Sequence, residues 1–329
     1  MFASKQLEKS IAHARRLLEQ SRVSADRLAL LQEANRISSD ASRQLRRGRA
    51  RKQQLAAEAL LVSSEVEMEL GDIDTAFTFL AVAANLAGHN SSSDAPNPQL
   101  AKIAARAAAW YAMLGLPDRA AAFAIECFTK TSDGTARYLA NVEACLALLS
   151  AGELGLVAKN VSGGSWRSFA QPVSSIVGIL QDAVGIELLD ERTLTEVGRD
   201  VCSEENRIAV PCVLTAANAL VRRGARTKAL ELINFARARL AAQSYDARSA
   251  ARLSQAVASL QLREGRPADA LMDALEAWVT LAEARYLTAS SSIRAGSYGT
   301  YGLATHTAMR AAVQLADWQG EAQSRFGWS

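Results

Sequence analysis

Side chains that could act as nucleophiles or general bases are few in this sequence and lie far apart along the chain. The three histidines are His13, His89 and His306. The local context of none of them indicates a catalytic triad or a cysteine–histidine pair. We interpret them as surface or helix-end residues. The sequence therefore predicts no catalytic residue and no enzymatic activity.

The four cysteines lack the spacing of a metal or redox site. Cys127, Cys145, Cys202 and Cys212 are scattered through apolar helical patterns, with no Cys-x-x-Cys pair and no histidine at ligand spacing. We expect them to be small core residues of a reduced, cytoplasmic protein, with a structural disulfide as the alternative. Neither a metal nor another cofactor is expected.

The segment RAGSYGTYGLATH, Arg294 to His306, is rich in glycine and lies before a predicted helix, where a phosphate can be cradled. However, no Lys-Ser or Lys-Thr pair follows at the spacing of a nucleotide-binding loop, and no strand is predicted before it. We interpret this segment as a loop that leads into a C-terminal helix pair.

The basic run RQLRRGRARK holds six lysine or arginine residues in ten positions. Clustered cations can bind the phosphates of nucleic acid. The residues concerned are Arg43, Arg46, Arg47, Arg49, Arg51 and Lys52. No helix-turn-helix pattern or aromatic stacking platform accompanies them, and the net charge of the chain is only +3. A charged helix end followed by a linker is the simpler interpretation, and nucleic-acid binding is the weaker alternative.

The overall composition predicts that helices position all of these side chains. Of 329 residues, 49% are hydrophobic and 6% are aromatic, and alanine, leucine, arginine and glutamate are abundant. The N-terminal segment is amphipathic and charged, unlike a secretory signal. No stretch approaches about 18 uninterrupted apolar residues, so no membrane span is predicted. We expect an all-α, cytoplasmic protein without a membrane partner.

The expected helices divide into two regions. They cover 4–20, 24–46, 50–70, 73–88, 98–114, 117–131, 134–151, 172–183, 189–201, 205–222, 226–242, 245–264, 267–287 and 299–325. A polar loop is expected from His89 to Pro98. A longer loop, 159–172, would separate N-terminal helical repeats (1–158) from C-terminal repeats and a final helix pair (173–329).

Four glycines share a pattern of small residues that indicates an internal repeat. Ser64 precedes Gly71 by seven residues, and Ala76 and Ala83 follow it by five and twelve. The same offsets give Ala108, Ala120 and Cys127 around Gly115, Ala217, Ala229 and Ala236 around Gly224, and Ala258, Ala270 and Ala277 around Gly265. Between Gly115 and Gly224 the pattern fades. At Gly152 and Gly185, Val157 and Asp190 replace the first alanine.

The pattern has a physical meaning. Glycine after an amphipathic stretch can adopt the left-handed conformation that ends a helix, and Asp or Pro just beyond it favours the start of the next helix. Small residues at the three offsets then let two antiparallel helices approach closely. Each unit is therefore predicted to be a helical hairpin, and the chain an α-solenoid of such hairpins.

This pattern resembles the tetratricopeptide repeat family, which has a small residue in the first helix, glycine at the turn and alanine twice in the second helix. Two features depart from the family. Its large aromatic residue near the start of the first helix is missing in all four units. The spacings of 44 residues from Gly71 to Gly115 and 41 from Gly224 to Gly265 exceed the usual length of about 34. The resemblance implies degenerate repeats that bind a protein or peptide on a concave face.

Projecting the family's groove positions onto the first helices gives ten candidate partner-binding residues. They are Glu65, Met68, Glu69, Lys102, Met113, Asn218, Arg222, Arg252, Gln255 and Arg263. Such a groove would be acidic in its first half and basic in its second. The family's carboxylate clamp is absent, because Leu61 and Glu65, then Ala105 and Ala109, occupy two of its positions. Capture of a chaperone's C-terminal carboxylate is therefore disfavoured.

The segment from Ala284 to Ala322 also resembles, through its aromatic and Arg-Ala spacing, the helical region before the CHAT protease domain of many bacterial repeat proteins. That resemblance implies a regulatory array that controls an effector, such as a CHAT-type protease, in another chain. The sequence favours a non-catalytic scaffold that binds a protein or peptide. A regulatory module of bacterial signalling or defence is the alternative, and a nucleic-acid-associated helical protein is the weaker one.

Overall fold

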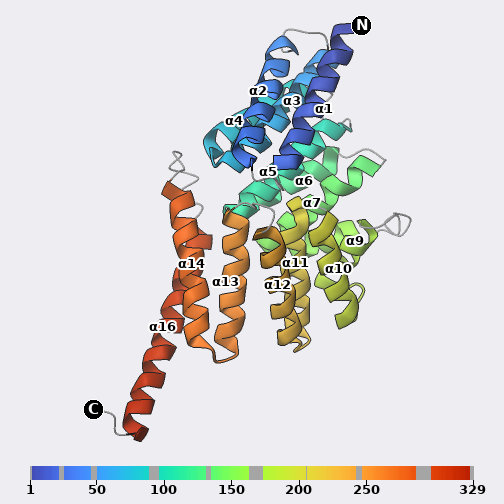
Figure 1. The fold of residues 1–329 in the computed structure, drawn as a ribbon. Coiled ribbons are helices and arrows are strands. Elements are labelled where there is room, and N and C mark those ends of the chain that lie inside the picture. The colour runs from blue at the N-terminus through green and yellow to red at the C-terminus, as the bar shows by residue number, and fades with distance from the viewer. Residues whose placement is uncertain are drawn as a thin grey trace.

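The computed structural model describes residues 2–21, 26–45, 50–88, 96–130, 135–162, 173–204, 206–241, 247–286 and 298–326. Within these ranges the chain forms 15 helices and no strand (Figure 1). The prediction of an all-α fold is confirmed. Every segment that the sequence predicted to be helical is a helix, with ends shifted by only a few residues.

The helices are numbered in chain order. Their bounds are α1 Phe2–Ser21, α2 Arg27–Leu45, α3 Ala50–Leu70, α4 Ile73–Gly88, α5 Pro98–Met113, α6 Pro117–Lys130, α7 Thr135–Ala151, α8 Leu154–Val161, α9 Val173–Ala183, α10 Glu191–Glu204, α11 Asn206–Arg222, α12 Arg226–Ala241, α13 Ala247–Arg263, α14 Pro267–Tyr286 and α16 Tyr298–Phe326.

Helix α8 was not expected. It has 8 residues and includes Lys159 to Val161, which the sequence analysis assigned to the loop 159–172. Residues 163–172 lie outside the described part of the chain. A helix this short, with Gly155 in its first turn, gives too few apolar positions for a helical period to be recognised.

Each predicted hairpin turn is closed by the same pair of backbone hydrogen bonds. At the first, Gly71 has a φ of +88°, its N–H donates to the Met68 carbonyl at 3.2 Å, and the Asp72 N–H donates to the Glu67 carbonyl at 2.9 Å. This is a Schellman motif, in which glycine adopts the left-handed conformation without a steric penalty. The turns at glycines 115, 224 and 265 have positive φ and the same two bonds. The placement of all four glycines at hairpin bends is confirmed.

Two further glycines extend the pattern beyond the prediction. Gly152 and Gly185 have φ values of +83° and +78° and close the same pair of bonds. After Gly152, Val157 is fully buried in the place of the first alanine. After Gly185 the turn is longer, since Asp190 directly precedes α10 and Leu194 takes the buried position. The array therefore contains six glycine-centred hairpins, from α3/α4 to α13/α14, within the described residues.

The small residues of the repeat pattern lie where the two helices of each hairpin touch. All of them are 2% exposed or less: Ser64, Ala76, Ala83, Ala108, Ala120, Cys127, Ala217, Ala229, Ala236, Ala258, Ala270 and Ala277. Short side chains at these points let the helices pack closely, as the pattern predicted.

The hairpins stack so that helices far apart in sequence become neighbours (Figure 1). At the N-terminal end, α1 and α2 cover α3. Phe77 of α4 joins the next hairpin through ring contacts to Trp110 and Tyr111, with centroid distances of 5.6 and 4.6 Å. Helix α7 contacts α5, α9 and α11, so the first helices of four hairpins pack together in the middle of the chain. At the other end α16 lies along α14 and runs past it (Figure 1).

The four cysteines are all buried and free, so the predicted core role is confirmed and the disulfide alternative is wrong. Burial raises the pKa of every one of these thiols, that of Cys202 to about 11 and that of Cys145 to about 12. The thiols therefore stay protonated near neutral pH and pack as small apolar groups.

A helical glycine at the contact between α10 and α12 yields a stability prediction. A Cβ added to Gly198 would lie 2.9 Å from Leu232 Cδ2 and 3.0 Å from Leu232 Cδ1, and Leu232 is fully buried. We expect Gly198→Ala to destabilise the protein by about 1–3 kcal/mol, because overpacking outweighs the helix propensity that alanine gains, about 1 kcal/mol. Urea unfolding followed by circular dichroism measures the change.

Gly155→Ala is the matched control, since nothing lies within 4 Å of the Cβ that it would add to α8. We expect this variant to be more stable than the parent by roughly 0.5–1 kcal/mol. A Gly198→Ala protein as stable as the Gly155→Ala protein would show that Leu232 moves aside without penalty.

Candidate partner-binding cleft

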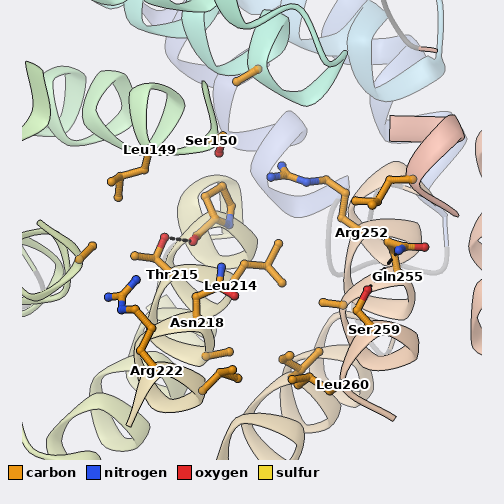
Figure 2. A pocket seen from close by; sticks show the side chains of 18 of the residues that line it. Leu149, Ser150, Leu214, Thr215, Asn218, Arg222, Arg252, Gln255, Ser259 and Leu260 are labelled. Carbon is orange, nitrogen blue, oxygen red and sulfur yellow. Dashed lines mark hydrogen bonds between the residues drawn. The ribbon is translucent and has the colours of Figure 1, made fainter. Parts of the chain in front are cut away.

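An open cleft of about 690 Å³ lies between α11 and α13. Figure 2 shows α11 and α13 as its two facing walls, with Leu149 and Ser150 of α7 beyond one end of α11. The turn after α5, the start of α8, the end of α9, and α12 and α16 each add one or two lining residues. The cleft is therefore formed mainly by first helices of the hairpins, the surface that the repeat pattern predicted for a partner.

Five of the ten predicted groove residues line this cleft together. They are Asn218 and Arg222 from α11 and Arg252, Gln255 and Arg263 from α13. Sequence analysis missed three hydroxyl residues beside them, Ser150, Thr215 and Ser259. Thr215 and Ser259 each lie one helical turn from a predicted residue, so they share its face of the helix. This spacing could have identified them.

The charge of the cleft has one sign. Arg222, Arg252 and Arg263 line it, and none of the described residues in its lining is acidic. Arg222 is partly compensated, since its Nη2 lies 3.7 Å from Asp182 Oδ1 behind the wall. In Figure 2 the Arg252 side chain extends from α13 toward the space between the walls. The cleft thus presents guanidinium groups to the space between its walls.

Apolar side chains supply much of the remaining lining. Leu214 and Val221 of α11 and Leu260 of α13 line the two walls, with Leu149 of α7 at one end. The Thr215 hydroxyl donates to the Pro211 carbonyl at 2.7 Å, so it is already satisfied as a donor. The lining therefore combines fixed cations with an apolar surface.

Gln255 connects the cleft wall to the C-terminal helix. This residue is 5% exposed, and its Nε2 donates to Thr307 Oγ1 of α16 at 2.8 Å and to Ser259 Oγ at 3.3 Å. Its Oε1 has no hydrogen-bond partner within the described part of the chain. Gln255 therefore holds α16 against α13 as well as lining the cleft.

The first half of the predicted groove does not reach the cleft. Glu65, Met68, Glu69, Lys102 and Met113 lie on α3 and α5, and none of them lines it. Met68 is 8% exposed and belongs to the core that α3 and α4 share with α5. The other four are only partly exposed. Their role in partner binding stays a prediction, and they would form a surface separate from the cleft.

Glu65 belongs to a nearly buried charge ladder across three first helices. Its Oε1 lies 3.1 Å from Arg106 Nη2 of α5, and Arg106 Nε lies 3.2 Å from Glu143 Oε1 of α7. The side chains of Glu65, Arg106 and Glu143 are 11%, 9% and 14% exposed. Sequence analysis missed Arg106, although a single arginine within the alanine-rich run AKIAARAAAWY indicates a buried cation. The acidic character expected at Glu65 is neutralised here.

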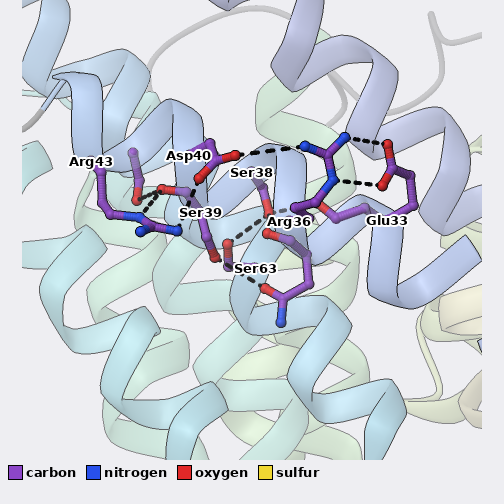
Figure 3. A network of polar contacts seen from close by, with 10 residues as sticks. Glu33, Arg36, Ser38, Ser39, Asp40, Arg43 and Ser63 are labelled. Carbon is purple, nitrogen blue, oxygen red and sulfur yellow. Dashed lines mark hydrogen bonds and ion pairs between the residues drawn. The ribbon is translucent and has the colours of Figure 1, made fainter.

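The basic run is only partly described. Arg46, Arg47 and Arg49 lie outside the described residues, and Arg51 and Lys52 belong to the first turn of α3, where Lys52 is exposed. Figure 3 shows Arg43 on α2 in an ion pair with Asp40, at 2.9 Å. Asp40 also lies 3.8 Å from Arg36, whose guanidinium bonds both oxygens of Glu33. At this end of α2, cations are therefore interleaved with carboxylates.

Below this surface, α2 and α3 are joined by polar contacts. The hydroxyls of Ser38 and Ser63 are 2.7 Å apart (Figure 3). One turn away, Asn35 Nδ2 donates to Glu67 Oε1 at 2.5 Å. Burial raises the pKa of the Glu67 carboxyl despite this hydrogen bond, with a smaller contribution from the charge of Asp72. These contacts fix the register of α2 on α3.

The remaining candidate segments offer no assembled chemistry. His13 and His306 are exposed, while His89 lies outside the described residues. Residues 294–297 are likewise outside, and Tyr298 to His306 forms the first turns of α16, so this part of the predicted loop is helical. Among the described residues, no group of histidine, cysteine, aspartate or glutamate is arranged to hold a metal ion. No described helix is both long and apolar enough to cross a bilayer.

No protein-family model matches the sequence, and no curated protein matches it. Among solved structures, the chain is similar to a circular tandem repeat protein with novel repeat topology and enhanced subunit contact surfaces, at 14% identity and a TM-score of 0.22. The match covers 95% of this chain and 74% of that one. With its recurring glycine-centred hairpins, the chain is an all-α helical repeat protein.

Proposed function

We propose that this protein is a non-catalytic scaffold that binds a segment of another protein in the cleft between α11 and α13. The observation that carries the proposal is the convergence of Asn218, Arg222, Arg252, Gln255 and Arg263 on one open cleft. These residues come from two different hairpins and were selected from the sequence, by projecting the groove positions of the tetratricopeptide family onto the repeat pattern. A solenoid presents its first helices as a continuous concave surface, and such surfaces bind extended partners.

The composition of the cleft suits a peptide. Ligand sites combine an apolar lining with a few polar groups that fix orientation. Here leucine and valine side chains line the walls, and arginine, asparagine and serine side chains stand among them. The tetratricopeptide-like arrangement, in which first helices line the groove, supports the same function.

The two alternatives rest on other parts of the chain. Control of an effector in another chain would use the same scaffold, so the cleft is compatible with a regulatory role. Nucleic-acid binding rests on the basic run from Arg43 to Lys52. Arg43 is paired with Asp40, and carboxylates of α2 lie beside it, which weakens the attraction for phosphates.

Blocking the cleft tests the proposal. Asn218 is exposed and lines the cleft, so Asn218→Trp fills it without disturbing the core. The affinity-tagged protein would be purified from its native cells and its stoichiometric partners quantified by mass spectrometry. We expect Asn218→Trp to reduce recovery of the partner at least about tenfold, the effect of losing a central contact of about 1.4 kcal/mol.

Asn234→Trp is the matched control, because Asn234 is also exposed and helical but lies on α12 outside the cleft lining. This variant should retain the partner. Full recovery of the partner by Asn218→Trp would place the binding surface elsewhere on the array.

A further inference from the structure

We propose that the segment bound in the cleft is an acidic peptide in which carboxylates alternate with apolar side chains. This inference rests on the proposed function and names the chemistry of its partner. It follows from the charge of the cleft, its apolar lining and the types of residue that carry them.

The charges of the cleft select an anion. Three arginines line it, and within the described part of the chain no acidic residue does. Asp182, which is 3% exposed, pairs with Arg223 as well as Arg222, so it offsets only part of the charge at the α11 wall. Arg252 and Arg263, two of the cleft's three cations, stand on the opposite wall. A basic ligand would meet like charges on both walls, which makes the cleft selective against it.

All three cations are arginines, and this favours carboxylates as the anionic groups of the ligand. Guanidinium groups are planar and can donate two parallel hydrogen bonds to one carboxylate, so they recognise Asp or Glu side chains with defined geometry. Arg252 and Arg263 lie eleven positions apart on α13, which is three helical turns. Two carboxylates on one extended or helical segment can therefore each reach a different guanidinium.

The apolar lining selects the residues between the carboxylates. Leu260 lies between Arg252 and Arg263 along α13, and Leu214 and Val221 line the facing wall on α11. Burying these side chains against a partner removes apolar surface from water, which favours binding at all salt concentrations. A purely acidic chain would leave this surface wet, whereas leucine or similar residues would cover it.

The same lining disfavours nucleic acid as the anion. None of the lining residues that the structure describes is aromatic. Single-stranded nucleic acid gains much of its affinity by stacking bases on aromatic side chains, and this cleft has no such platform. The phosphates could pair with the arginines, but the bases would lie on aliphatic walls. An acidic, partly apolar peptide satisfies both features.

The experiment is selection from a phage-displayed library of random short peptides on the intact protein. We expect peptides recovered from the parent protein to be rich in Asp and Glu with interspersed apolar residues. The double variant Arg252→Glu with Arg263→Glu should instead recover neutral or basic peptides. Neutral or basic peptides recovered from the parent would overturn the acidic assignment.

One selected peptide, labelled with fluorescein, would then be measured by fluorescence anisotropy. The double variant should bind it at least about tenfold more weakly, because reversal replaces two attractions with two repulsions. Arg263→Glu alone, at an exposed position, should weaken it several-fold and checks the result if the double variant does not fold. Lys9→Glu with Arg16→Glu, two exposed positions on α1, makes the same charge change far from the cleft and should have no effect.

Two further outcomes separate this inference from the proposed function. If Asn218→Trp weakens binding of the selected peptide but the arginine changes do not, the scaffold function stands and the acidic assignment falls. If Asn218→Trp leaves peptide binding intact, the cleft is not the site and both fall. Labelled polyuridine that binds the parent more tightly than the selected peptide, and loses that affinity in the double variant, would make nucleic acid the ligand instead.

Discussion

Arg106→Met is expected to destabilise the protein by about 3–5 kcal/mol, because it leaves two nearly buried carboxylates without their counter-charge. Arg106 lies 3.1 Å from Glu65 and 3.2 Å from Glu143, so one guanidinium joins α3, α5 and α7. Methionine fills a similar apolar volume, so the loss comes from the charge and not from a cavity. Urea unfolding measures the total change, and hydrogen exchange in α3, α5 and α7 shows whether these helices are the ones affected.

A triple variant tests whether the lost stability comes from the unpaired carboxylates. In Glu65→Gln, Arg106→Met, Glu143→Gln no buried charge remains, and we expect it to recover most of the stability lost by Arg106→Met alone. Arg119→Met is the surface control, since Arg119 is exposed on α6 with its guanidinium 5.6 Å from the Tyr111 ring. A loss below about 1 kcal/mol for Arg106→Met would mean that Glu65 and Glu143 reach water once the arginine is gone.

The parts of the fold that could be predicted from the sequence are those set by local chemistry. Gly71 ends α3 because a left-handed residue closes a Schellman motif, and that requirement is visible in the chain as glycine followed by aspartate. Ala76 and Ala83 mark the helix contact because only short side chains fit there. Both signals lie within one hairpin, so a single sequence is enough to read them.

The parts that could not be predicted depend on which hairpins become neighbours. Glu65 occupies a groove position in its own helix, yet Arg106 from the next hairpin covers it. Asn218 occupies the equivalent position, six residues before its glycine, and Arg252 occupies another groove position. Both line the cleft, because the fifth and sixth hairpins leave a space between their first helices. The repeat pattern gives the position of a residue within one hairpin and contains nothing about the distance between successive hairpins. The basic half of the predicted groove therefore lines one cleft, and the acidic half does not.

The turn after Gly185 also depends on contacts that its local sequence does not show. It is longer than the other turns, and a residue at the end of α9 holds it in place. Asp182 Oδ2 accepts the Leu189 N–H at 2.8 Å, which holds the extended turn against the end of α9. The same carboxylate pairs with Arg223 of the α11/α12 turn. A local sequence window around Gly185 shows the longer turn but not the arginine that supports it.

Asp182→Ala is accordingly expected to destabilise the protein by about 2–4 kcal/mol. The side chain of Asp182 is 1% exposed, and its removal leaves the Leu189 N–H without its acceptor and Arg223 without its counter-charge. Arg223 is 23% exposed, so water can solvate part of its charge, which places the loss below that of Arg106→Met. Urea unfolding measures the loss, and faster hydrogen exchange at residues 186–190 would locate it in the long turn.

Asp269→Ala is the control for Asp182→Ala, because Asp269 pairs with Arg266 within one exposed helix start, at 2.6 Å. Exposed pairs of this kind contribute at most about 1 kcal/mol.

Asp182→Ala is also expected to change peptide binding. Without Asp182 the guanidinium of Arg222 loses its partner behind the wall, so the cleft becomes more positive and should bind an acidic peptide more tightly although the protein is less stable. Weaker peptide binding by a folded Asp182→Ala protein would mean that Asp182 positions Arg222 for the ligand and does not compete with it.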